Sequence, residues 1–181
     1  MVEINSFARP VRVESIPRDG LAQMIEASPA ERAAVAKLAG LPAIGRLAAE
    51  LTLRPTGRGI IHVRGEVHAE VTQICVVSLE PFDATLNEPV DVRFAAPMGE
   101  AAGRRGPPIT AAEAESLTIG DQDAPDPIID GKIDLGALAV EFMILGLDPY
   151  PRKPGARFTA PSNAEGGDPP LASLGEEPKD N

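Results

Sequence analysis

Apolar and polar residues alternate along much of the first half of the chain. From Ile61 to Val71 the odd positions are apolar and the even positions are polar or charged, with Gly65 at one odd position. Successive side chains of a β-strand point to opposite faces of its sheet, so this pattern predicts an antiparallel strand with one buried and one solvated face. We expect Gly65 to mark a bend or a bulge in this strand.

Four further stretches combine a shorter alternation with turn signals, and they predict strands at 7–16, 21–28, 47–55 and 84–94. Pro10 lies near the start of the first stretch. Because proline cannot donate a hydrogen bond to a sheet ladder, it favours an edge position for that strand. The predicted inward residues of the last stretch are Leu86, Val90, Val92 and Phe94.

Residues 28–40 carry the signals of a helix at both ends. Ser28 is a good N-cap, Pro29 suits the first helical position, and Glu31 completes a capping box. Gly40 supplies the C-terminal stop. We therefore predict a helix over this segment.

A second helix is predicted within residues 133–151, where Asp134 can serve as the cap and Gly146 as the end. Almost every residue from 135 to 145 is apolar, and Glu141 is the only charged one. A helix of this composition is buried on most sides, either in the core of its own domain or against a partner. Self-association through this helix is one of the alternatives.

These elements predict a single α+β domain over residues 1–158, built on an antiparallel sheet that allows a barrel-like arrangement. Residues 95–130 are rich in Ala, Gly, Pro and acidic residues and are too long for an ordinary connection, so we expect a flexible acidic insert. Residues 159–181 are polar, acidic and rich in Pro and Gly, which predicts a disordered tail.

The charge of the chain is strongly acidic and unevenly distributed. The net charge is −10, with +1 on residues 1–75 and −11 on residues 76–181. A surface of this sign repels phosphate backbones and attracts basic proteins. We therefore rank a basic protein partner above naked RNA. No apolar run reaches the length of a signal peptide or a membrane span, and a cytoplasmic location is expected.

The candidate chemistry is sparse. Cys75 is the only cysteine, and His62 and His68 are the only histidines. Six residues of extended strand would separate the two histidines by roughly 20 Å, and Cys75 falls on the opposite face, so no metal site is expected. Ser78 lies in no nucleophile motif, and no phosphate-binding loop is present. Cys75 is interpreted as a small buried residue, and no cofactor is expected.

Several ordered motifs resemble the YceD family. They are C-V-V-S-L-E-P-F at 75–82, E-P-V-D-V-R-F at 88–94, D-G-K-I-D-L-G-A-L-A-V-E-F at 130–142 and L-D-P-Y-P-R-K-P-G at 147–155. Bacterial members often carry C-x-R-C-L-E-P-F at the first site. The resemblance implies a role in accumulation of large-subunit ribosomal RNA, and hence in ribosome biogenesis, without enzymatic activity.

The chain departs from the family pattern at the first motif. Ser78 stands where a second cysteine is usual, Val77 stands where an arginine is usual, and no cysteine pair follows the predicted second helix. Members with four cysteines could bind zinc, and this chain lacks that set. The resemblance therefore implies a zinc-less member in which Cys75 is a vestige kept for packing.

Function is accordingly expected to be that of a non-catalytic ribosome-assembly factor. Its predicted partners are a basic ribosomal protein or ribosomal RNA of the large subunit. The candidate partner-binding residues are Glu80, Pro81, Phe82, Asp134, Leu135, Glu141, Arg152 and Lys153. The alternative is a small-molecule-binding or hydrolytic domain with a site at the mouth of the sheet, near His62 or His68.

Overall fold

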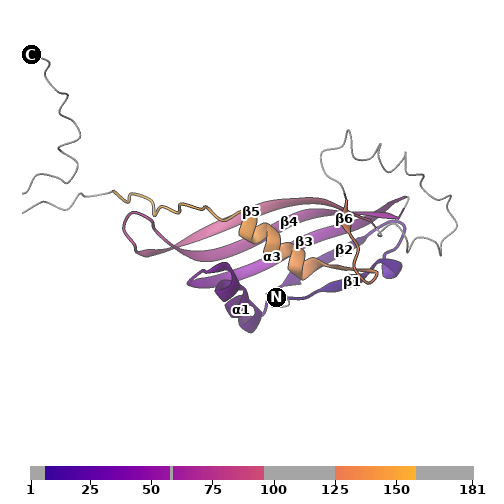
Figure 1. Cartoon of the computed structure of the whole chain (residues 1–181), viewed down its shortest axis with the longest axis horizontal. Coiled ribbons are helices and arrows are strands. Elements are labelled where there is room, and N and C mark those ends of the chain that lie inside the picture. Colours follow the sequence, from indigo (N-terminus) through magenta and orange to yellow (C-terminus); the bar gives the residue numbers. More distant parts are fainter. Residues whose placement is uncertain (1–6, 58, 96–124, 158–181) are drawn as a thin grey trace, which may run out of the picture.

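The computed structural model describes residues 7–57, 59–95 and 125–157. A five-stranded sheet in the order β2-β3-β4-β5-β6 forms its body (Figure 1). The strands are β2 (Leu21–Glu26), β3 (Ala43–Gly57), β4 (Ile60–Ile74), β5 (Pro81–Ala95) and β6 (Asp126–Pro127). All pairings are antiparallel except the short one between β5 and β6. The predicted α+β class is confirmed, and the sheet is not closed into a barrel.

The three central strands, β3, β4 and β5, are each 15 residues long. Each is longer than the corresponding segment in which the sequence alternates, which is 47–55, 61–71 or 84–94. The odd-numbered residues of β4 from Ile61 to Val71 are buried except Gly65, and the even-numbered ones face solvent, as predicted. Gly65 lies opposite Leu51 of β3. A Cβ atom at position 65 would overlap the Glu50 carbonyl group, so β3 approaches β4 there more closely than a larger residue permits.

Two helices cover one face of the sheet, α1 (Pro29–Ala39) and α3 (Leu135–Leu145) (Figure 1). The core lies between the helices and this inner face. Its largest buried side chains include Leu47, Leu51, Leu53, Val63, Val67, Val71, Val35, Leu135 and Met143. The other face carries the even-numbered residues of β2, β3 and β4 and the odd-numbered residues of β5, and none of the described helices covers it. We call it the open face.

Both helix caps form as the sequence predicts. Ser28 accepts a hydrogen bond from the Glu31 amide, the Glu31 carboxylate accepts one from the Ser28 amide, and Gly40 adopts a left-handed conformation. The Asp134 side chain accepts bonds from the first amides of α3. The second helix begins after Asp134 and ends before Gly146, as the predicted cap and stop within 133–151 require.

The N-terminal strand prediction at 7–16 is wrong in its extent. Only β1 (Pro10–Arg12) is extended, and a 3-10 turn, Val13–Ser15, follows it. β1 pairs with β7 (Lys132–Asp134) in a separate two-stranded sheet, a long-range pairing that local alternation does not reveal. Of the predicted insert, residues 96–124 lie outside the described residues, as does the predicted tail from 159 onward.

Candidate partner-binding surface

The loop between β4 and β5 closes on itself through backbone hydrogen bonds. The Cys75 amide donates to the Glu80 carbonyl oxygen at 2.9 Å, and the Leu79 amide donates to the Cys75 carbonyl oxygen at 2.9 Å. Ser78 Oγ also accepts a bond from the Glu80 amide at 3.4 Å. The loop of the first family-like motif is therefore a fixed structure rather than a loose connection.

The segment that follows α3 runs beside this loop and is bonded to it. The Val76 amide donates to the Pro151 carbonyl oxygen at 2.9 Å, and Lys153 Nζ lies 2.9 Å from Glu80 Oε2. The hydrogen bond to Glu80 raises the pKa of Lys153. We define the hairpin-end surface as residues 75–82 together with residues 147–157.

Apolar side chains project from the hairpin-end surface into solvent. Leu79 is 76% exposed, Tyr150 is 72% exposed and Val76 is 45% exposed. Leu79 also has a φ of 58°, in the left-handed region that branched side chains rarely occupy. A rigid loop that holds a large apolar residue outward at a conformational cost is typical of a contact surface.

Cys75 lies beneath this loop and is fully buried. Its Sγ accepts hydrogen bonds from the amides of Val77 and Ser78, each at 3.4 Å. Bonds from the side chain and the backbone of Ser78 lower the pKa of Cys75 to about 6, against the opposing effect of burial. The predicted burial is confirmed, but the surroundings are backbone amides rather than the aliphatic core.

The candidate residues from the sequence divide into two groups. Five of them gather at the hairpin-end surface, namely Glu80, Pro81, Phe82, Arg152 and Lys153. The others lie on or beside α3. Leu135 is fully buried, Asp134 bonds the helix amides and the Arg9 amide, and Glu141 is exposed on the helix. Leu135 and Asp134 thus have structural roles that hold α3 to the N-terminal segment.

The histidines lie on the open face, away from Cys75. His62 Nε2 contacts Asp91, which also pairs with Arg64 at 3.1 Å, and these hydrogen bonds, that of His62 first, lower the pKa of Asp91. His68 Nδ1 lies 2.7 Å from Asn87 Oδ1. Within the described part of the chain, no three His, Cys, Asp or Glu residues converge as metal ligands would.

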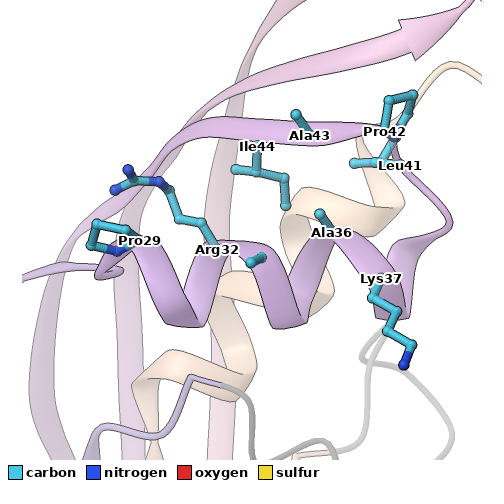
Figure 2. A pocket seen from close by; sticks show the side chains of 9 residues that line it. Pro29, Arg32, Ala36, Lys37, Leu41, Pro42, Ala43 and Ile44 are labelled. Carbon is cyan, nitrogen blue, oxygen red and sulfur yellow. The ribbon is translucent and has the colours of Figure 1, made fainter.

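Two shallow hollows mark the described surface. One, of about 450 Å³, lies between α1 and the start of β3, where Ala36, Leu41 and Ile44 line it (Figure 2). The side chains of Arg32 and Lys37 extend in different directions there (Figure 2). The other, of about 470 Å³, lies on the open face. Neither histidine lines either hollow, so neither hollow matches the predicted small-molecule site.

The pairing of Lys153 with Glu80 is the feature that the sequence interpretation missed. The two residues are 73 positions apart, and no local pattern connects them. The only signal was their joint occurrence in the family-like motifs. Leu79 was also missed as a surface residue, because an apolar residue beside a strand is ordinarily assigned to the core.

Comparison with known proteins gave one match. The family model described as large ribosomal RNA subunit accumulation protein YceD matches residues 63–180, which include the whole hairpin-end surface. Neither the curated proteins nor the solved structures contain a match. None of the described helices has the length and apolar character needed to cross a membrane.

Proposed function

Because the chain belongs to the YceD family, in which large-subunit ribosomal RNA accumulation is the named role, we propose that it supports this accumulation as a non-catalytic binding protein. The hairpin-end surface is the proposed contact site. The observation that carries the proposal is the outward position of Leu79 on a loop fixed by backbone bonds. Its apolar area is available for burial by a partner.

A basic protein of the large subunit is the proposed direct partner. Leu79 and Val76 of the loop and Tyr150 of the segment bonded to it are exposed apolar residues, and the Glu80–Lys153 pair belongs to the same surface. An apolar centre with a polar rim is the anatomy of a protein–protein interface. The net charge of −10 favours association with basic proteins and disfavours free RNA.

Affinity capture tests this proposal. Leu79→Asn removes the apolar side chain and suits the left-handed backbone, because asparagine tolerates positive φ. We expect the wild-type protein to retain large-subunit ribosomal proteins from a ribosome-assembling lysate, as identified by mass spectrometry. We expect the variant to retain roughly tenfold less ribosomal protein than the wild type, as for the loss of an interface hot spot.

Ile129→Asn is the matched control, because Ile129 is 69% exposed and lies outside the hairpin-end surface. Its capture should equal that of the wild type. Equal capture by Leu79→Asn and the wild type would contradict the proposed contact site. Tight binding of protein-free ribosomal RNA, with no ribosomal protein retained, would contradict the proposed partner.

A further inference from the structure

The open face of the sheet separates its charges along the strands. The end near the β3–β4 turn carries Arg54, Arg64, Arg93, His62 and Asp91, and is basic. The remainder is what we call the acidic half. It holds five acidic residues and one arginine, with a net charge of −4, namely Glu26, Glu50, Glu66, Glu70, Asp83 and Arg46.

At the centre of the acidic half, two carboxylates lie opposite each other and repel. Glu50 of β3 and Glu66 of β4 are direct cross-strand partners, and both are exposed. Like charges directly opposite each other destabilise a sheet. His68 Nε2 lies 3.7 Å from Glu66 Oε2, and among the described residues Glu50 forms no ion pair within 4 Å. A cation between the two carboxylates would relieve this repulsion.

The hollow on the open face lies at this pair. Its lining includes Met24, Glu50, Thr52 and Glu66. Met24 of β2 pairs with Glu50 in the sheet, and its side chain is 74% exposed. The hollow thus combines an exposed flexible apolar side chain with two carboxylates. This combination matches a lysine or arginine side chain, which has an apolar stem and a charged end.

The two long segments of the chain outside the described residues are acidic as a whole. Residues 96–124 contain five acidic and two basic residues, a net charge of −3, and residues 158–181 contain five acidic and one basic, a net charge of −4. The acidic half repels both segments, and it equally repels the same half of a second copy. Charge complementarity therefore points to a basic partner.

We propose that the acidic half of the open face docks a lysine- or arginine-rich segment of a protein partner, with one cationic side chain seated between Glu50 and Glu66 and its stem against Met24. The inference rests on the proposed function in that the partner is a basic protein. It assigns a second contact surface, on the face of the sheet opposite the helices.

A labelled deca-lysine peptide is the probe, and binding to the full chain is measured by fluorescence anisotropy at low and at physiological salt. We expect Glu50→Gln combined with Glu66→Gln to weaken binding about fivefold, the range for two exposed ion pairs. The matched control combines Asp19→Asn with Asp130→Asn, which removes the same charge from exposed turns. It should change the affinity by less than about twofold.

The same paired substitution has a readout that needs no ligand. Because it removes the cross-strand repulsion, the midpoint of urea unfolding should rise, whereas the control should leave it unchanged. Amide chemical shifts on addition of the peptide should change in β2, β3 and β4. A fall in the midpoint, or shifts confined to the hairpin-end surface, would overturn the inference.

Equal weakening by both paired variants would also overturn it, because net charge alone would then explain binding. The inference would also be overturned if the protein bound an oligouridylate and did not bind the deca-lysine peptide. Failure here is distinguishable from failure of the proposed function. If the Glu50 and Glu66 variant still captures ribosomal proteins while Leu79→Asn does not, only the second surface is refuted.

Discussion

Leu79 and Cys75 belong to one loop, yet they meet opposite environments. Leu79 stands in solvent with a positive φ, whereas Cys75 is enclosed by the amides of Val77 and Ser78. The hydrogen bonds from these two backbone amides fix the loop around the sulfur, and the fixed loop in turn holds Leu79 outward. The cysteine therefore helps to fix the shape of the loop.

The first residue-scale prediction concerns the titration of Cys75. Donated hydrogen bonds, that of the Ser78 side chain first, lower its pKa from 9.0 to about 6. A lowered pKa favours folding at high pH, so this contribution is complete above about pH 9 and is lost as the pH falls toward 6. Thiolate absorbance at 240 nm should titrate near pH 6 in the folded protein.

A midpoint at or above 9 would show instead that burial dominates and that the sulfur is a neutral thiol. Cys75→Ser provides the baseline, because it removes the only thiol in the chain. Despite its thiolate character, native Cys75 should react slowly with a disulfide reagent such as DTNB, since the sulfur is fully buried. Unfolding in guanidinium should restore a fast reaction.

The second residue-scale prediction concerns Glu31. The hydrogen bond from Arg9, followed by the bonds from Ser28, lowers the pKa of Glu31 from 4.5 to about 2. Its contribution is present above pH 4.5 and is lost as the pH falls toward 2. Urea unfolding of the wild type and Glu31→Gln should differ at pH 7, and the two should converge near pH 2. A constant difference across this range would contradict the assignment.

At the scale of elements, the parts with local signals are the ones that could be predicted. Ser28, Glu31 and Gly40 define α1, and the alternation from Ile61 to Val71 defines the buried face of β4, because caps and strand period depend only on neighbours in sequence. The pairing of β1 with β7 and the path of the segment after Gly146 depend on distant residues. Local sequence patterns cannot predict those contacts.

Contacts between residues that are distant in sequence also determine the candidate site, so the sequence alone could not show how its residues are arranged. The motifs indicated Glu80 and Lys153 separately, and only the fold brings them to 2.9 Å. Leu135 matched a motif as well, yet it is a core residue. A motif match therefore does not distinguish candidate contact residues from core residues.

Gly65 supports a prediction at the element scale. A Cβ atom there would overlap the Glu50 carbonyl, whereas one at Gly45 would meet its nearest neighbour at 3.6 Å, an ordinary contact. Gly65→Ala should therefore lower the free energy of unfolding by about 2 kcal/mol, as for an overpacked site. Gly45→Ala should have a much smaller effect. Equal effects in urea unfolding would show that β3 and β4 do not approach as described.

At the scale of the whole molecule, the two helices and the open face give the protein two unlike sides. The helices bury the inner face completely enough to form the core, and the outer face remains polar and charged. The hairpin-end surface projects at one end of the long sheet (Figure 1). The apolar hairpin-end surface and the acidic half of the open face are the two features on which the proposed contact with basic ribosomal components rests.

The most direct test of the central claim is the ratio of mature large-subunit to small-subunit ribosomal RNA in cells depleted of this protein. Depletion should lower the ratio, wild-type protein and Ile129→Asn should restore it, and Leu79→Asn, folded and present at the same level, should not. A ratio unchanged by depletion, or fully restored by Leu79→Asn, would contradict the account.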